Sequence, residues 1–493
     1  MLASCRGGLD PDPSPQPVPV PEDVPTGISY QLLVYSFADS DGDGIGDFKG
    51  IESKLDYLSS LGVEAVWLSP VHPAASYHGY DVTDYYALNP EYGDEDDFRH
   101  LLEAAHARDI RIYLDYVLNH CSKFHPWFTD ALADKGSRYR DYFFIYNDGT
   151  YKCVFGEWMP DFNYGPSSTC ESSPAFTDLA SAADKWIRMG VDGFRLDAVK
   201  HIYDNPTNSD NPTFLKKFYD HCSTTYKSVG HTGNIYMVGE HFSEASEVAP
   251  YFKGIPALFE FSFWWRLEEG ISSGKGKDFA ATIAGYRKSY AKVRPDFIAA
   301  TKLTNHDEDR AAEQLGKDIS KEKLSAAVLM TAPGEPYIYQ GEELGYWGSK
   351  AGGDEYVRAP IGWNQDGKGT AKAKLGGKIC AGMLTAERSV ESQSKSASSL
   401  LNFYRSLGRL RKEHPSLSAG DFTARTVTNP AIAAWYRSYK AEKVLVLHNF
   451  SAEEQALSFM QDKLDKVIFS SGEIKIKDNM VSMGAYSSVV LLQ

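Results

Sequence analysis

The stretch VDGFRLDAVKH, residues 191–201, decides the fold. It begins as an apolar run and ends in ionisable side chains, as a buried strand does where it reaches the rim of a sheet. Seven similar runs, separated by helical patterns, lie at residues 28–37, 63–68, 110–117, 234–240, 257–261, 297–304 and 336–340. Eight strands alternating with helices predict an α/β protein built on a (β/α)₈ barrel rather than an open sheet.

The spacing of the runs is uneven between the third and the fourth. Of residues 121–190, only 173–190 has a helical pattern, with Ser173 or Pro174 at its start and Gly190 at its end. Residues 121–172 are therefore predicted to form a subdomain, called subdomain B below, inserted at the face where the strands end. The barrel is assigned to residues 26–120 and 173–414.

The last part of the chain has another pattern. After the helical segment 398–413, short alternating strands are predicted at 432–439, 443–449, 466–469 and 487–492. We expect a C-terminal antiparallel β-sandwich over residues 415–493.

The first 25 residues indicate a tether. LASC, residues 2–5, resembles the lipobox of bacterial lipoproteins, in which the cysteine, here Cys5, becomes the lipid anchor. Seven prolines between Pro11 and Pro25 favour an extended spacer. We therefore expect an extracellular or cell-surface bacterial lipoprotein that meets a membrane only through this anchor; the alternatives are a chance N-terminal sequence and a disordered leader.

Composition excludes some functions. A net charge of −15 argues against a nucleic-acid partner, because phosphate requires a basic surface. The 9 Trp, 30 Tyr and 25 Phe would suit sugar rings, although large core residues account for most of them. Cys153 and Cys170 are close enough in sequence to form a disulfide in an exported protein, the alternative being free thiols.

Ionisable clusters end four of the predicted strands. They are DYVLNH (115–120), RLDAVKH (195–201), Glu240 after the fifth run, and TNHDEDR (304–310). A single strand-end carboxylate is usually a helix cap, but four clusters in order on one barrel are hard to attribute to capping. Active sites of such barrels lie at this end of the strands.

With these motifs the chain resembles the α-amylase family of glycoside hydrolases, over nearly all of residues 26–493. GYDVTDY (79–85) and MPDFN (159–163) match as well. The resemblance implies a barrel with subdomain B and a β-sandwich. It implies that Asp197 is the nucleophile, Glu240 the general acid/base and Asp307 the stabiliser of the transition state.

The residue types suit the reaction. Cleavage of a glycoside needs an acid for the departing oxygen and a carboxylate near the anomeric carbon. Glu240 must therefore be protonated before attack, while Arg195, on the same strand face as Asp197, is expected to keep that carboxylate ionised. The family retains the anomeric configuration, which requires a carboxyl separation of about 5–5.5 Å.

The resemblance also assigns substrate contacts. Tyr80 would stack on the sugar ring, and His120 and His306 would bind its hydroxyls. Lys200 and His201 would line the acceptor side, which favours endo-cleavage of α-1,4-glucan in starch or maltooligosaccharides.

Two other functions remain open. The segment MPDFN and the acidic loop described next are typical of neopullulanase- or oligo-1,6-glucosidase-like enzymes. An inactive glucan-binding protein on the same barrel is the remote alternative, and the presence of Asp197 and Glu240 argues against it.

The loop DSDGDGIGD, residues 39–47, predicts a Ca²⁺ site. Its oxygen donors alternate, and Gly50 stands where an EF-hand would have its bidentate glutamate. The loop resembles the calcium site after the first strand in oligo-1,6-glucosidase-like and related amylases. The implied ligands are Asp39, Asp41, Asp43, Asp47 and the backbone carbonyl of Ile45.

A second calcium is left open. Asn119, Asp161 and the carbonyl of His201 match the family's site between barrel and subdomain B. The alternative is that Asn119 and Asp161 hydrogen-bond to each other and pin the insertion. Arg358 and Trp363, in RAPIGW, loosely resemble a segment near the donor subsites.

Overall fold

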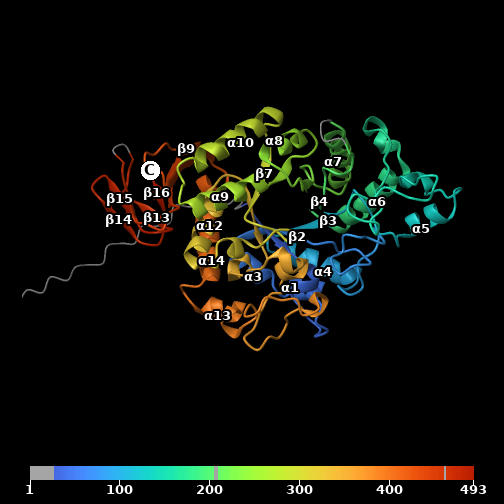
Figure 1. Ribbon diagram of the computed structural model, residues 1–493, viewed down its shortest axis with the longest axis horizontal. Coiled ribbons are helices and arrows are strands. Elements are labelled where there is room, and N and C mark those ends of the chain that lie inside the picture. Colours follow the sequence, from blue (N-terminus) through green and yellow to red (C-terminus); the bar gives the residue numbers. More distant parts are fainter. Residues whose placement is uncertain (1–26, 205–208, 460–461) are drawn as a thin grey trace, which may run out of the picture.

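The computed structural model describes residues 27–204, 209–459 and 462–493. The predicted lipobox and proline-rich spacer at 1–25 lie outside them. Eight parallel strands close into a barrel in sequence order, β1 to β8 (Figure 1). The strands are β1 (Ile28–Leu32), β2 (Val63–Leu68), β3 (Arg111–Tyr116), β4 (Gly193–Leu196), β5 (Tyr236–Gly239), β6 (Ala257–Glu260), β7 (Ile298–Lys302) and β8 (Glu335–Tyr339).

The predicted barrel is confirmed, and the strands are shorter than the apolar runs. The first run, 28–37, is the clearest case: β1 stops at Leu32 and Val34–Phe37 form the short helix α1. At this point the Leu33 amide donates to Gln340 Oε1 at 2.7 Å instead of to a strand. The run is apolar throughout because both the strand and the helix are buried.

Helices surround the barrel. In the first half of the chain they are α2 (Phe48–Glu52), α3 (Leu55–Ser60), α4 (Glu95–His106), α6 (Pro174–Met189) and α7 (Asp210–Ser228), whereas α5 (Pro126–Ala133) belongs to the inserted residues 121–172. In the second half they are α8 (Ala245–Val248), α9 (Phe261–Ser273), α10 (Phe279–Val293), α11 (Ala311–Gln314), α12 (Ile319–Thr331), α13 (Val390–Lys395), α14 (Leu400–Glu413) and α15 (Pro415–Ser418). Helix α6 has the predicted bounds: Pro174 is its first residue, and Gly190 ends it with a φ of 117°.

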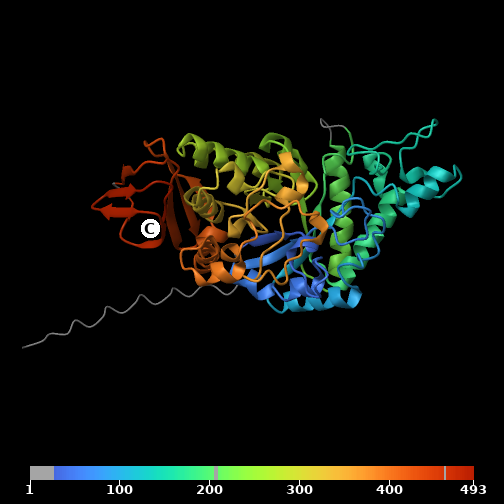
Figure 2. The ribbon, with the colours of Figure 1, turned by 60° about the horizontal axis from the view of Figure 1, so that its bottom comes forward.

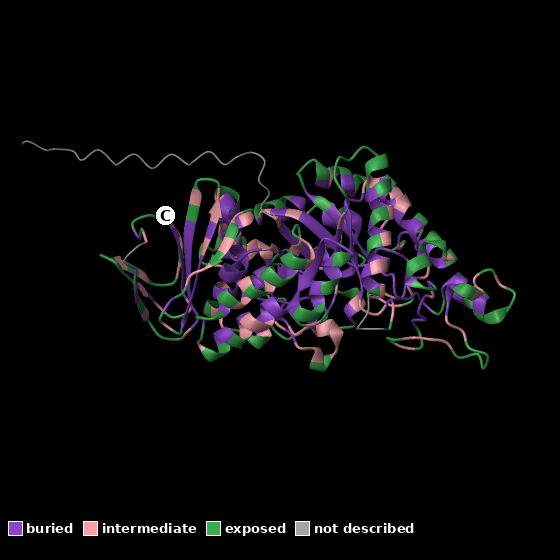
Figure 3. Ribbon diagram, turned by 90° about the horizontal axis from the view of Figure 1, so that it is seen from above, coloured by how far each residue is buried: buried purple, intermediate pink, exposed green. Residues whose placement is uncertain are grey.

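Side chains fill the interior of the barrel, whose strands are buried (Figure 3). Trp67, Phe259 and Tyr337 pack against one another there. Tyr113 and Tyr236 stack at 4.5 Å across Gly193, where a Cβ would lie 2.7 Å from the Tyr113 ring. The barrel is therefore a packed core, and only its rim offers a site.

Residues 121–172 lie at one end of the molecule, around α5 (Figure 2). They contain few regular elements and are joined to the barrel by backbone pairing of His120 with Asp161. Cys153 and Cys170 are free thiols in the structure, which agrees with the alternative to a disulfide.

The C-terminal region lies at the opposite end (Figure 1). It has a five-stranded sheet, β13-β16-β11-β10-β9, and a three-stranded sheet, β12-β15-β14. The strands are β9 (Asp421–Ala424), β10 (Ile432–Tyr439), β11 (Glu442–Asn449), β12 (Gln455–Ser458), β13 (Val467–Ser471), β14 (Ile474–Lys477), β15 (Met480–Met483) and β16 (Ser488–Leu492). The sequence patterns do not indicate β9, β12, β14 and β15, because each has only four residues, some of them exposed, and so lacks a long apolar run.

This region is fastened to the barrel by buried polar contacts. Arg437 donates to the carbonyls of Thr331 and Ala332, and the Trp435 indole donates to Thr331 O at 3.2 Å. Within the described residues, no helix is both long and apolar enough to cross a membrane.

Candidate active site

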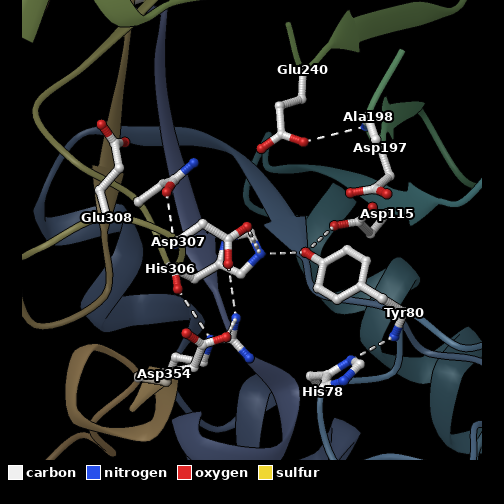
Figure 4. A network of polar contacts seen from close by, with 12 residues as sticks. His78, Tyr80, Asp115, Asp197, Ala198, Glu240, His306, Asp307, Glu308 and Asp354 are labelled. Atoms are coloured by element: carbon white, nitrogen blue, oxygen red, sulfur yellow. Dashed lines mark hydrogen bonds and ion pairs between the residues drawn. The ribbon is translucent and has the colours of Figure 1, made fainter. Parts of the chain in front are cut away.

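The end of β4 places Asp197. The backbone turns sharply there, since Ala198 has a φ of 46°, a left-handed conformation that alanine rarely adopts. The Ala198 amide donates to Glu240 Oε2 at 3.2 Å (Figure 4). The turn thus brings the carboxylate after β4 toward the carboxylate after β5.

Arg195 is shared by three carboxyl groups. Its Nη1 lies 2.7 Å from Asp197 Oδ1 and 2.8 Å from Asp115 Oδ1, and its Nη2 lies 2.9 Å from Glu240 Oε2. The guanidinium is fully buried, so these contacts are largely desolvated. One positive charge therefore holds Asp115, Asp197 and Glu240 together at the rim.

Three carboxyls around one guanidinium do not all ionise easily. Burial raises the pKa of Asp197, and the Glu240 and Asp115 carboxylates raise it further, against the opposing effect of Arg195. Burial also raises the pKa of Asp115 to about 6. Arg195 lowers the pKa of Asp197, as expected, but burial and the neighbouring carboxylates oppose this effect, because Arg195 is shared. The cluster as a whole tends to hold a proton, which acid catalysis requires.

Asp307 follows β7 and lies in a different electrostatic environment. Arg358 Nη2 contacts its Oδ1 at 2.8 Å, and Lys350 Nζ lies 3.8 Å away. Burial alone would raise the pKa of Asp307, but the interaction with His306, followed by those with Arg358 and Lys350, holds it well below its usual range. Asp354 pairs with both cations and so fixes them in turn.

Tyr80 and His306 form a stacked pair beside Asp307 (Figure 4). Their ring planes differ by 9°, and the Tyr80 hydroxyl lies 2.6 Å from His306 Nε2. Burial lowers the pKa of His306 to about 3, so the ring is neutral. Because Gln31 Nε2 donates to Nδ1 at 2.8 Å, the proton is on Nε2, which lies 3.2 Å from Asp307 Oδ2.

His120 faces the same rim from the end of β3. Its Nε2 is buried and has no hydrogen-bond partner among the described residues. Burial lowers the pKa of this ring to about 3, so it too is neutral. The half-exposed Phe155 of subdomain B packs against both His120 and His201, at 5.2 Å in each case.

A groove lies beside the loops that follow β4 and β5, and none of the three predicted catalytic carboxylates lines it. Its volume is about 1120 Å³, and Lys200, His201, Tyr203, His241 and Glu247 are among the residues that line it. Lys200 Nζ donates to the carbonyl of Phe242 at 3.0 Å, which ties the end of β4 to the end of β5. The structure thus places both residues assigned to the acceptor side on this groove.

The acidic loop gathers three of its four aspartates. Carboxylate oxygens of Asp39, Asp41 and Asp43 lie within 4.8 Å of one another, and no ion pair to them occurs in the described part of the chain. This donor set suits a hard cation. Asp47 lies outside the group, because it caps α2 through the Gly50 amide at 2.7 Å and binds Ser40. The Ile45 amide donates to Asp43 Oδ1 at 2.7 Å.

The junction of barrel and subdomain B has the contact expected of the alternative to a second calcium. Asn119 Nδ2 lies 3.3 Å from Asp161 Oδ1. Lys152 Nζ lies 3.5 Å from Asp161 Oδ2, so an ammonium group already faces this carboxylate.

Some residues of the site escaped sequence reasoning. Asp115 stands in a recognised motif, but no local signal shows that it shares Arg195. Lys350 and Asp354 lie in an irregular segment, and Phe155 in the insertion, where no periodicity marks them. For Arg358, the loose resemblance of RAPIGW to a donor-subsite segment does not indicate the contact with Asp307. Trp363 is buried, and its indole donates to Phe37 O at 2.7 Å.

A buried carboxyl pair at the rim of a (β/α)₈ barrel, with neutral histidines and an aromatic ring for a hydroxyl-rich ligand, defines a glycoside hydrolase. The family model "Alpha amylase, catalytic domain" matches residues 31–420, and "Alpha-amylase SusG C-terminal domain" matches residues 432–490. The chain therefore belongs to the α-amylase family of glycoside hydrolases.

Individual relatives agree. Alpha-amylase SusG of Bacteroides thetaiotaomicron is 38% identical, covering 94% of this chain and 90% of the relative. Alpha-amylase 3 of Dictyoglomus thermophilum is 34% identical over 94% and 92%. The crystal structure of α-amylase from H. orenii superposes with a TM-score of 0.84 at 34% identity, covering 94% of this chain and 99% of that one.

Proposed function

We propose that this protein is a retaining, endo-acting α-amylase that hydrolyses α-1,4-glucosidic bonds of starch and maltooligosaccharides. The observation that carries the proposal is the pairing of Asp197 and Glu240 through one guanidinium, Arg195, at 2.7 and 2.9 Å. A nucleophile and an acid held this close favour double displacement over attack by a water placed between them. Relatives named α-amylase support the substrate class.

The reaction would run in two steps. Asp197 attacks the anomeric carbon while Glu240 gives its proton to the departing glycosidic oxygen, and a covalent glycosyl-enzyme forms. Glu240, now ionised, takes a proton from water, which attacks the same carbon and releases Asp197. For the first step Glu240 would hold the proton and Asp197 would be the carboxylate once substrate is bound.

The surrounding groups would bind the sugar ring. His120 Nε2 is a buried polar atom without a partner in the described residues, so a sugar hydroxyl would satisfy it. Asp307, kept ionised by Arg358 and Lys350, would accept hydrogen bonds from ring hydroxyls that strengthen as positive charge develops. Tyr80 would offer its ring face, and Lys200 and His201 would contact the acceptor.

The groove lined by Lys200 and His201 supports endo-action. If these two residues contact the acceptor, a volume of about 1120 Å³ leaves room there for more than one glucosyl unit. The rival oligo-1,6-glucosidase-like function would be expected to release glucose first.

We also propose a bound calcium ion and a cellular location for this protein. We propose that Asp39, Asp41 and Asp43 hold one Ca²⁺, whose role would be structural, because the loop contributes no residue to the carboxyl cluster. The motif LASC supports lipid anchoring at Cys5 and a place at the bacterial cell surface or outside it.

Product analysis on amylose, pullulan and panose tests the function. We expect a mixture of maltooligosaccharides from amylose early in the reaction and little attack on panose. Glucose as the sole early product would contradict endo-action. Asp197→Asn should lose about 10⁴-fold or more of kcat while melting like the wild type, because a neutral amide is a poor nucleophile. The control is Asp220→Asn, an exposed aspartate on α7.

A further inference from the structure

The junction between barrel and subdomain B contains a lysine beside the residues that the resemblance assigns to a second calcium. Lys152 Nζ lies 3.5 Å from Asp161 Oδ2 and 2.9 Å from Asp204 Oδ2. Asp204 belongs to the loop after β4, three residues beyond His201. The ammonium group thus lies between the inserted subdomain and the loop that carries the acceptor-side residues.

Lys152 is held in this place by its own backbone. Its amide donates to Phe144 O at 3.0 Å, and its carbonyl accepts from the Asp161 amide at 2.9 Å. The side chain is only 17% exposed, and the ammonium lies 5.0 Å from the centre of the Phe144 ring. A lysine pinned on both sides and largely buried is a fixed part of the junction rather than a mobile surface group.

The Asp161 carboxylate needs a positive charge beside it. Its Oδ2 is buried, and the Lys152 ammonium is the cation that the described residues place next to it. Asp161 is 1% exposed, so its charge would be costly without a cation nearby. Lys152 supplies one. A calcium ion at the same oxygens would lie next to the ammonium and would be repelled by it.

We propose that Lys152 is a built-in cation that takes the place of calcium at this junction. Its ammonium neutralises Asp161 and reaches Asp204, and so ties subdomain B to the loop after β4 without a metal. Chelation would then act on the Asp39 loop and leave the junction intact. The proposal does not depend on which glucan is cleaved.

Melting of the full chain tests the tie. In EDTA, Lys152→Met should melt about 3 °C or more below the matched variant Lys135→Met, an exposed lysine of the same subdomain, because Asp161 loses its counter-charge. Millimolar Ca²⁺ should restore part of that loss. Equal melting of the two variants in EDTA would overturn the proposal.

The calcium content of the protein tests directly whether Lys152 takes the place of a calcium ion. By elemental analysis after dialysis against calcium and then buffer, wild type and Asp161→Asn should hold the same amount, at most one equivalent per chain. Loss of one equivalent in Asp161→Asn would overturn the proposal. The measurement on wild type requires no variant, so it remains decisive if a variant fails to fold. Two tightly bound equivalents of calcium per wild-type chain would refute a built-in cation.

Discussion

The catalytic rim and the Asp39 loop both gather three carboxyl groups, but they do so in opposite ways. At the rim, Asp115, Asp197 and Glu240 surround a buried guanidinium that the protein itself supplies. In the loop, Asp41 and Asp43 are exposed, backbone amides orient the carboxylates, and no lysine or arginine of the described residues forms an ion pair with them. The comparison teaches that the source of the cation decides what a carboxylate cluster does.

The buried rim cluster can store a proton because its internal charge is too small to ionise every carboxyl. The oxygen donors of the exposed loop suit an external cation. Glu342 is a third case, a buried carboxyl without an adjacent lysine or arginine ion pair among the described residues. Its Oε1 accepts from the Tyr404 hydroxyl at 2.7 Å, and burial raises its pKa to about 8.

Replacement of the rim cation should have the largest effect. Arg195→Lys keeps the charge, but a single ammonium cannot contact three carboxyls at once. We expect kcat/KM on a maltooligosaccharide to fall about 10³-fold or more, with a lower melting temperature. Arg188→Lys, exposed at the end of α6, is the control. Activity within tenfold of wild type would mean that sharing of the guanidinium is not what organises the rim.

Loss of a loop carboxylate should change stability rather than catalysis. Asp41 is suited to this test because, within the described residues, its side chain accepts only from the Asp43 amide at 3.1 Å. Asp41→Ala should melt several degrees below wild type in calcium and match it in EDTA, with kcat at 25 °C nearly unchanged.

The control for the loop is Asp366→Ala, an exposed aspartate paired with Lys368. If EDTA leaves the melting temperature of wild type unchanged, the loop does not hold a structural calcium. The rim and the loop would then not differ in the source of their cation.

The smallest effect is expected at Glu342. Its pKa is raised from about 4.5 to about 8 in the folded protein, so the neutral form stabilises the fold below pH 4.5 and that stability is lost as the pH rises through 8. Glutamine does not ionise. We therefore compare the melting temperature of Glu342→Gln with that of wild type at each pH. The variant minus wild-type difference should be about 1–3 °C larger at pH 8.5 than at pH 5. Glu413→Gln, exposed at the end of α14, should show no such trend; parallel curves for wild type and Glu342→Gln would contradict the assignment.

The parts of the site that are local in sequence were predictable. The alternating aspartates of the loop act over nine residues, so their spacing alone indicates a cation site. The strand-end motifs likewise placed Asp197, Glu240 and Asp307 at one rim, because parallel strands of a barrel all end at the same face. Asp47 has a further role that the spacing does not show, because its side chain caps the start of α2.

The sequence by itself determined the order of strands and helices, the insertion after β3 and the residue types available at each strand end, since periodicity and short-range spacing encode them. Only the tertiary structure decided which charges meet. Arg195 with Asp115 and Glu240, Arg358 with Asp307 and Lys152 with Asp204 are pairs between residues 45 to 80 positions apart in the chain. Their protonation depends on a shared desolvated space, and that space exists only once the barrel has closed.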